Sequence, residues 1–421
     1  MDKIEILGGK PLNGKISISG AKNAALPILA ASLLTNSKLE LCNIPKLSDI
    51  NSMIRLLQSL NATIHKKSGK VMIKSQKPKN NFASYDLVRK MRASFLVLGP
   101  LLSRYGEAKV SLPGGCAIGG RPIDIHLKGF EKMGVNFNIK DGYVVGKVEK
   151  KLNGATIHLP FKSVGATENL LMAATLAKGK TVIVNAAKEP EIVDLGECLK
   201  LMGASIDGLG TSKIIINGVK KLIGCNYKIM PDRIEAGTYL LAVLGCSGCV
   251  ELVNLNKEVI QNLLNTFSQF KDLDLVEKNN TSILVKFTKK DYKSINIKTL
   301  PFPGFPTDLQ AQLSAVMTKA KGTSTIEESI FENRFMHVAE LQRMGANIVI
   351  NGSKVIIKGK KKIFGAQLMA TDLRASSSLI IAGLMAEGKT IINRVYHLDR
   401  GYEEIEKKLS KCNVNIKRIK G

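Results

Sequence analysis

The sequence predicts an α/β (α+β) fold of two domains, each made of three βα-type repeat units with helices buried inside and sheets outside. A chain of 421 residues is too long for one compact core of ordinary size. A helix-like apolar segment rich in small residues recurs six times, and each copy leads through a turn into a short strand. Six units divide evenly into two domains of three.

The first helix of each unit is predicted to be buried on all sides. It is apolar around its whole circumference, whereas a helix lying over a sheet keeps one polar face. Such helices suit the interior of a ring of sheets. The six segments are Ala24–Leu34, Ala93–Leu102, Ala166–Ala177, Ala236–Leu244, Ala311–Ala320 and Ala375–Met385.

Each buried helix is followed by a predicted strand and then by an amphipathic helix. The strands are Leu39–Asn43, Ala108–Leu112, Thr181–Asn185, Val250–Asn254, Ser324–Glu328 and Thr390–Arg394. Most amphipathic helices end at a glycine or asparagine, which favour the left-handed conformation just past a helix end. These caps are Asn61, Gly134, Gly203, Gly345 and Asn413, and the fourth unit, around Phe270–Val276, is the unclear one.

The domain boundaries follow from the strand that opens the chain. Residues 1–9 read as a strand and a turn ahead of the first repeat. We expect this strand to complete the domain formed by the second half. The prediction is one domain of residues 1–21 plus 231–421 and another of residues 22–230.

Composition excludes several classes of protein. The start of the chain lacks the basic and apolar regions of a signal peptide, and the longest apolar runs are far shorter than a membrane span. We therefore expect a cytoplasmic protein with no membrane insertion, and a monomer. The seven cysteines and five histidines are scattered, so we expect reduced thiols, no metal and no cofactor.

The formal net charge of +27 would attract polyanions or small anionic substrates. The lysines are spread through turns and helix ends, and the chain has no tryptophan. This pattern offers neither a basic arm nor a stacking platform for bases, so we expect no nucleic-acid partner. A basic RNA-binding repeat protein stays the alternative from another class.

One apparent redox motif is interpreted as a turn. Cys246 and Cys249 have the C-x-x-C spacing, but they occupy the helix-to-strand turn filled by Lys178–Lys180 and Glu387–Lys389 in sister units. A structural turn is the favoured interpretation.

The segment Pro113–Pro122 holds four glycines around Cys116, with Arg121 five positions further on. Positive charge nearby lowers the pKa of a thiol and makes it reactive. The alternative is a glycine-rich turn with an idle cysteine.

Charged residues gather where several buried helices begin. Lysine or arginine there opposes the helix dipole, which favours anions at that end. A cation at the positive end of a helix therefore suggests a bound anion between the two. The clusters contain Lys22, Arg92, Asp232 with Arg233, Asp308, and Asp372 with Arg374. Alternatively, such residues are helix caps, salt bridges or surface charges.

Six segments together resemble one family, the UDP-N-acetylglucosamine 1-carboxyvinyltransferases among the enolpyruvyl transferases. They are Gly20–Ala24, Pro113–Pro122, Phe302–Gln312, Phe331–His337, Ala370–Ser376 and His397–Glu403. The resemblance spans nearly the whole chain. It implies two inside-out α/β barrel domains that close on a cleft containing the active site. It also implies transfer of enolpyruvate from phosphoenolpyruvate to the 3′-hydroxyl of UDP-N-acetylglucosamine, with release of phosphate, as the first committed step of peptidoglycan synthesis.

The resemblance also implies roles for individual residues. Cys116 matches the proton donor, which can become linked to phosphoenolpyruvate, and Asp308 matches the carboxylate that accepts the hydroxyl proton. Phosphoenolpyruvate would be bound by Lys22, Asn23, Arg121 and Arg400. UDP-N-acetylglucosamine would contact Asn23, Arg92, Arg121, Pro122, Ile123, Asp124, Ile125, Ser163, Val164, Gly165, Asp308 and Ile330. Arg334, Asp372 and Arg374 would line the closed cleft.

Both substrates are multiply anionic, and the fork of arginine matches phosphate and carboxylate in paired hydrogen bonds. One departure from the family is Phe161, which stands where some members carry lysine and is given no ionic role. We further expect the 113–122 segment to act as a lid after sugar-nucleotide binding, and the epoxide antibiotic fosfomycin to alkylate Cys116.

Two alternatives stay within the same fold. The sister enzyme that uses shikimate 3-phosphate as the acceptor lacks the cysteine segment, which argues against it here. A catalytically idle paralogue is the other.

Overall fold

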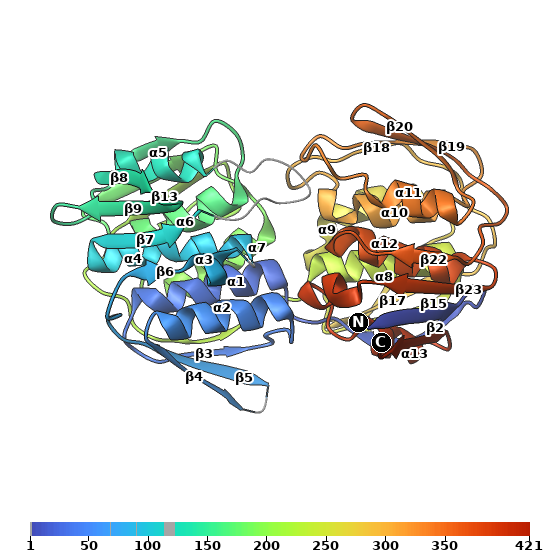
Figure 1. Cartoon of the computed structure of the whole chain (residues 1–421), viewed down its shortest axis with the longest axis horizontal. Helices are drawn as coiled ribbons and strands as arrows, with labels where there is room; N and C mark the ends of the chain where they lie inside the picture. The colour runs from blue at the N-terminus through green and yellow to red at the C-terminus, as the bar shows by residue number, and fades with distance from the viewer. Residues whose placement is uncertain (1, 68, 90, 113–122) are drawn as a thin grey trace. The chain divides into compact units, whose positions relative to one another are not determined.

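The computed structural model describes residues 2–67, 69–89, 91–112 and 123–421 (Figure 1). It divides into two compact units. Unit 1 contains residues 2–19 and 231–421, and unit 2 contains residues 20–112 and 123–230.

The described residues form six four-stranded sheets that share one topology. In each sheet an edge strand runs parallel to its neighbour, and the remaining two pairings are antiparallel. The sheets of unit 2 are β14(Asn226–Lys228)–β3(Leu39–Cys42)–β5(Lys70–Ser75)–β4(Ala62–Lys67), β6(Phe82–Ala83)–β7(Glu107–Ser111)–β9(Tyr143–Val148)–β8(Val135–Lys140) and β10(Thr156–His158)–β11(Lys180–Val184)–β13(Lys213–Asn217)–β12(Ser205–Asp207).

Unit 1 repeats this arrangement. Its sheets are β22(Gln367–Met369)–β23(Lys389–Asn393)–β1(Lys3–Leu7)–β24(Asn415–Ile419), β16(Asp274–Asn279)–β17(Ser282–Phe287)–β15(Gly248–Val253)–β2(Leu12–Ser17) and β18(Ile297–Lys298)–β19(Thr323–Glu327)–β21(Lys354–Lys358)–β20(Asn347–Asn351). Because most strands alternate buried and exposed residues, one face of each sheet covers the core and the other faces solvent.

Three helices form the centre of each unit. In unit 2 they are α1(Lys22–Ala31) with η1(Ser32–Leu34), the 3-10 turn η2(Arg92–Val97) with α4(Leu98–Tyr105), and α6(Val164–Ala174). In unit 1 they are α8(Arg233–Cys246), η4(Thr307–Leu309) with α10(Gln310–Met317), and α12(Leu373–Met385). The three in unit 1 contact one another, and all residues of α10 are buried. Helices inside and sheets outside are therefore confirmed.

The second helices of the repeats are shorter or more amphipathic. They are α2(Ser48–Ser59), α5(Asp124–Lys132), α7(Pro190–Leu201), η3(Lys257–Ile260) with α9(Gln261–Phe267), α11(His337–Arg343), and η5(Val395–Arg400) with α13(Ile405–Ser410). The short helix α3(Tyr85–Val88) instead precedes η2. The five predicted caps all have left-handed backbones: Asn61, Gly134, Gly203, Gly345 and Asn413.

The predicted helix ends need small corrections. The segment predicted as helix 93–102 begins as the 3-10 turn η2, and those predicted to end at Ala177 and Ala320 end at Ala174 and Met317. Hydrogen bonds of the 3-10 type, from the N–H of residue i+3 to the carbonyl of residue i, follow both helix ends, for example from Ala177 to Ala174. The last turns are therefore tighter than an α-helical turn.

Two edge strands are exchanged between the units. In four sheets the edge strand precedes the central helix of its own sheet. By contrast, β2 precedes α1 in sequence but pairs with β15 in unit 1, and β14 precedes α8 but pairs with β3 in unit 2. β1 lies between β23 and β24, so both strands that open the chain belong to sheets of the second half.

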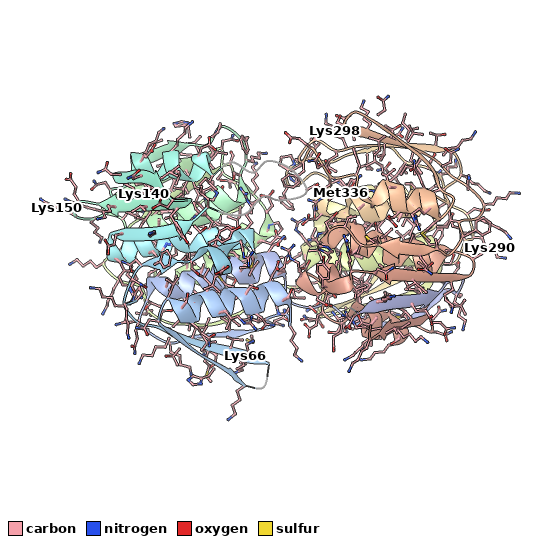
Figure 2. The ribbon with its side chains drawn as sticks, viewed as in Figure 1. Lys66, Lys140, Lys150, Lys290, Lys298 and Met336 are labelled. Atoms are coloured by element: carbon pink, nitrogen blue, oxygen red, sulfur yellow. The ribbon has the colours of Figure 1, made fainter. Side chains whose placement is uncertain are left out.

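The excess of lysine lies at the surface. The lysines labelled in Figure 2, Lys66, Lys140, Lys150, Lys290 and Lys298, are exposed and come from separate strands and turns. Within the described ranges, no helix is long and apolar enough to cross a membrane.

Candidate active site

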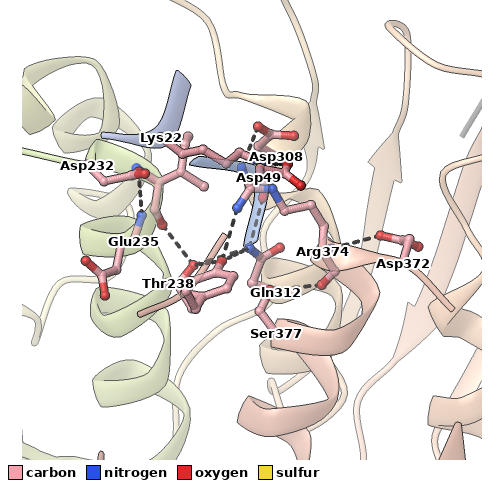
Figure 3. A network of polar contacts seen from close by, with 12 residues as sticks. Lys22, Asp49, Asp232, Glu235, Thr238, Asp308, Gln312, Asp372, Arg374 and Ser377 are labelled. Carbon is pink, nitrogen blue, oxygen red and sulfur yellow. Dashed lines mark hydrogen bonds and ion pairs between the residues drawn. The ribbon is translucent and has the colours of Figure 1, made fainter. Parts of the chain in front are cut away.

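The central helices of unit 1 carry polar side chains near their N-terminal ends, and Figure 3 shows Thr238 of α8, Gln312 of α10 and Arg374 of α12 close together. The Tyr402 hydroxyl lies 2.8 Å from Thr238 Oγ1 of α8 and accepts hydrogen bonds from Gln312 Nε2 of α10 at 3.2 Å and Arg374 Nη1 of α12 at 3.4 Å. Tyr402 is 1% exposed. This buried network holds the three helix starts together.

Asp308 of η4 lies beside this network and pairs with two arginines. Arg334 Nη2 is 2.5 Å from Asp308 Oδ1, and Arg374 Nη2 is 2.8 Å from Oδ2. The two arginine side chains are almost fully buried, whereas that of Asp308 is 24% exposed. Burial is the largest effect and lowers the pKa of Arg374, but Asp308, Tyr402 and Asp232 together outweigh it, so the pKa lies above its ordinary value. The structure thus brings together three residues predicted at the site.

Asp372 and Arg400 lie near His397 in the same unit. Burial and the charge of Arg400 lower the pKa of His397, and the carboxylate of Asp372 opposes them. Asp372 also caps α12, since its Oδ1 accepts hydrogen bonds from the N–H groups of Arg374 and Ala375 at 2.8 and 3.0 Å. The cap interpretation of Asp372 is therefore confirmed, as is a salt bridge for Arg374.

Ile330 is tied to η4 through a buried carboxylate. Its N–H donates to Glu328 Oε1 at 2.8 Å, and Thr307 Oγ1 donates to Glu328 Oε2 at 2.8 Å. Because Thr307 precedes Asp308, the backbone at Ile330 is held to the turn that carries Asp308.

In unit 2 the predicted cations lie at helix starts. Lys22 and Asn23 are the first residues of α1, and Arg92 opens η2, which contacts α1. Lys22 Nζ is 3.3 Å from Asp49 Oδ2 of α2, and the two side chains are 12% and 6% exposed. Lysine is therefore held at the N-terminal end of a buried helix by a neighbouring carboxylate.

The remaining predicted residues of unit 2 lie at the starts of α5 and α6, and Gly165 of α6 lies close to His126 of α5. Ile123 precedes α5 and Asp124 begins it, while Ser163 caps α6 by accepting from the N–H of Ala166 at 3.4 Å. A Cβ on Gly165 would lie 3.5 Å from His126 Cε1. Burial, reinforced by Arg92, lowers the pKa of His126 to about 3. The starts of α5, α6 and η2 thus meet at a neutral imidazole.

The tautomer of His126 follows from Asn169. The Gly99 N–H donates to Asn169 Oδ1 at 2.8 Å, and Asn169 Nδ2 donates to the Phe95 carbonyl at 3.1 Å. Asn169 Nδ2 also lies 3.2 Å from His126 Nδ1, which must therefore accept. The proton of the neutral ring is on Nε2, the atom beside Gly165.

Three predicted site residues, Cys116, Arg121 and Pro122, lie outside the described residues.

The apparent redox motif, Cys246 and Cys249, lies within the described residues. Cys246 ends α8, Ser247 and Gly248 have positive φ, and Cys249 lies in β15. Burial raises the pKa of the Cys246 thiol to about 12. The interpretation of this pair as a turn is confirmed.

Sequence reasoning missed four polar residues at these sites. Thr238 and Gln312 are polar residues buried near the N-terminal ends of helices whose remaining turns are mostly apolar, which is a usable signal. Tyr402 lies inside one of the recognised motifs, and His126 directly follows Ile125. Within the described ranges, no group of three or more His, Cys, Asp or Glu residues could hold a metal ion.

Comparison with known proteins agrees with this arrangement. The family model of EPSP synthase (3-phosphoshikimate 1-carboxyvinyltransferase) matches residues 6–409. Proteins named UDP-N-acetylglucosamine 1-carboxyvinyltransferase are similar over their full length: 53% identical in Pelagibacter ubique, covering 100% of both chains, and 51% in Paramagnetospirillum magneticum, covering 100% of this chain and 99% of the relative.

Solved structures support the fold. The enolpyruvyl transferase NikO from Streptomyces tendae superposes with a TM-score of 0.89 at 21% identity, covering 99% of this chain and 98% of that one. EPSP synthase from Acinetobacter baumannii gives 0.78 at 18% identity over 100% of both. The chain therefore belongs to the EPSP synthase family of enolpyruvyl transferases, and within it to the UDP-N-acetylglucosamine 1-carboxyvinyltransferases.

Proposed function

We propose that this enzyme transfers enolpyruvate from phosphoenolpyruvate to the 3′-hydroxyl of UDP-N-acetylglucosamine and releases phosphate. The full-length relatives at 50% identity and above carry this proposal, because they bear the name of that reaction. The reaction is the first committed step of peptidoglycan synthesis, and its site of action is predicted to be the cytoplasm.

Asp308 is proposed as the base. The hydroxyl adds to C2 of phosphoenolpyruvate and loses its proton, while the methylene carbon gains one; phosphate and a methyl proton then leave. Arg334 and Arg374 each occupy one carboxylate oxygen of Asp308. Two permanently charged guanidinium groups favour the ionised carboxylate, which is the form that accepts a proton.

The residues of unit 2 are proposed to bind the anionic groups. Lys22 and Arg92 lie at helix starts, where backbone N–H groups also favour phosphate. Together with Asn23, Arg121 and Arg400 they would bind the phosphates and the carboxylate of the two substrates, with Cys116 as the proton donor. Pro122–Ile125, Ser163–Gly165 and Ile330 would contact the sugar nucleotide, and Asp372 would orient residues near Arg400.

The test is an assay of phosphate release with phosphoenolpyruvate and either UDP-N-acetylglucosamine or shikimate 3-phosphate. We expect release only with the sugar nucleotide. Asp308→Asn should lower kcat roughly 10²–10⁴-fold, the range of general acid–base catalysis. Cys116→Ala should lose turnover, and intact mass should show a single fosfomycin adduct on the parent but none on Cys116→Ala.

Cys249→Ala is the matched control, since Cys249 is a free thiol in β15 remote in sequence from the motifs. It should keep both activity and the fosfomycin adduct. Release of phosphate with shikimate 3-phosphate alone, or an adduct that survives Cys116→Ala, would contradict the proposal.

A further inference from the structure

Arg400 is the last residue of η5, and the residues on both sides of it are held in place. Asp399 precedes it, and Gly401 and Tyr402 follow it. The position of an arginine guanidinium that binds a small anion depends on where the backbone of that residue is held, because the arginine side chain is long and flexible. The contacts of these neighbours therefore decide where Arg400 can reach.

Arg418, in the C-terminal strand β24, pairs with Asp399 through two hydrogen bonds. Its Nη2 is 2.6 Å from Asp399 Oδ1 and its Nη1 is 3.1 Å from Oδ2. Its Nε also donates to Glu406 Oε1 of α13 at 2.9 Å, and Asp2 Oδ2 lies 3.5 Å from its Nη1. The Arg418 side chain is 23% exposed and that of Glu406 8%. Paired arginine–carboxylate contacts of this kind fix orientation as well as distance.

The hydrogen bonding with Asp399 is the largest cause of a pKa for Arg418 above the ordinary value, ahead of the opposing effect of burial, and Glu406 raises that pKa further. Because the guanidinium makes four hydrogen bonds to side chains of η5 and α13, it joins both elements to β24.

The other side of Arg400 is held by the core. A Cβ on Gly401 would lie 2.6 Å from Leu373 Cδ2, so the backbone there packs directly against the start of α12. Tyr402 is 1% exposed, and its hydroxyl accepts hydrogen bonds from Arg374 and Gln312. The segment 399–402 is thus fixed on one side by β24 and on the other by the network beside Asp308.

We propose that Arg418 is a positioning residue for phosphoenolpyruvate binding, acting through Asp399 to hold Arg400 in the orientation that contacts the substrate. This inference rests on the proposed role of Arg400. In this proposal Arg418 acts only through Asp399 and does not itself bind the substrate.

The test compares Arg418→Met, which removes the guanidinium, with Arg418→Lys, which keeps the charge but not the fork. Both should raise the KM for phosphoenolpyruvate, Arg418→Met by roughly 10- to 100-fold, the scale on which a small misplacement of a binding group acts. The KM for UDP-N-acetylglucosamine should stay within about twofold, because the inference involves only the smaller substrate. A purely structural role would lower the apparent kcat through loss of folded enzyme and would leave both KM values unchanged.

Asp399→Asn and the double variant test the link between the two residues. Asp399→Asn should reproduce the effect of Arg418→Met, and combining them should add little, because both remove the same contact. The matched control is Lys417→Met: Lys417 is the neighbouring strand residue, pairs with Glu5 and is 68% exposed. It should leave both KM values unchanged.

Arg400→Lys separates the inference from the proposed function. If Arg400→Lys leaves the KM for phosphoenolpyruvate unchanged, the role proposed for Arg400 is wrong. If it raises that KM but Arg418→Lys and Asp399→Asn do not, the positioning role of Arg418 is wrong. Thermal unfolding of each variant identifies any that fail to fold, and Arg418→Lys and Asp399→Asn then decide the question.

Discussion

Burial sets the protonation of several residues in the two units. The pKa of His126 falls to about 3 and that of His337 to about 4, in each case mainly because the ring is buried. Burial raises the pKa of Asp194 to about 6, and that of Glu168 lies well above its ordinary value. Both histidines are therefore neutral at physiological pH, so neither supplies the positive charge that the substrates require.

His126 should make the folded protein sensitive to acid. The unfolded chain binds a proton at His126 near pH 6.5, whereas the folded chain does not until the pH falls to about 3. Stability is therefore lost as pH falls from 6.5 towards 3, by up to about 1.4 kcal/mol per pH unit. His126→Gln should lose this component, measured as a shallower decline of the urea unfolding free energy between pH 7 and pH 4.

Asp194 and Glu168 contribute to the pH dependence of the unfolding free energy with the opposite sign, because their folded pKa values are raised. Their contributions are the same in the parent protein and in His126→Gln, so they cancel when the two slopes are compared. The control is His65→Gln, at an exposed position of β4. An unchanged slope in His126→Gln would show that the ring is not protected from protonation.

At the scale of single elements, the helix caps show how the repeat unit tolerates sequence change. The second helix ends at Gly134, Gly203 or Gly345 in three units and at Asn61 or Asn413 in two others, all with positive φ. Glycine pays no Cβ penalty there, and asparagine is the side chain that adopts this conformation most readily. Backbone conformation, rather than the particular residue, is what the repeat maintains.

Gly203 offers a clean test of this rule, since a Cβ there would meet nothing within 4 Å and its φ is +99°. Gly203→Val should cost about 1–2 kcal/mol of unfolding free energy because only the backbone conformation is strained. Gly203→Asn should cost distinctly less. Urea unfolding measures both, and equal losses would show that the cap conformation is not the cause.

At the scale of the whole molecule, the exchange of β2 and β14 decides which parts of the chain can fold alone. Unit 2 contains every strand of its three sheets within residues 20–230. Unit 1 does not form one continuous segment, because β1 occupies an interior position between β23 and β24 and β2 pairs with β15. The second half alone would leave the partners of β1 unpaired.

A fragment of residues 20–230 should therefore unfold cooperatively in urea, whereas residues 231–421 alone should not. Joining residues 1–19 after Gly421 through a short glycine linker should restore cooperative unfolding to the second fragment. The geometry permits this, because Lys3 pairs with Ile419 across the antiparallel β1–β24 ladder. Cooperative folding of residues 231–421 without this extension would contradict the assignment of β1.

Much of the fold could be predicted because each repeat carries its own local signals. The central helices, the strands after them and the caps follow from apolar pattern and turn chemistry over a few residues each. The charged helix starts at Lys22, Arg92, Asp308 and Arg374 are where the sequence predicts them. The 3-10 geometry of η2 and η4 was not predicted, since it depends on how tightly each turn packs.

The candidate site could be predicted only in part. Motif resemblance selected the residues, but the pairing of Asp308 with both Arg334 and Arg374 joins positions 26 and 66 residues apart in the chain. The hydrogen bonds that meet at the Tyr402 hydroxyl and the pairing of Arg418 with Asp399 likewise join residues distant in sequence, so a local sequence pattern could not predict them.

The sequence alone determined the six units, their buried helices and the charges at helix starts, because these depend on the 3.6-residue and two-residue periods and on the backbone preferences of glycine and asparagine. Only the tertiary structure decided which sheet receives β1, β2 and β14 and which carboxylate each buried arginine meets. Those choices are made between segments distant in sequence, where burial leaves a charged group no stable alternative to the partner that the fold supplies.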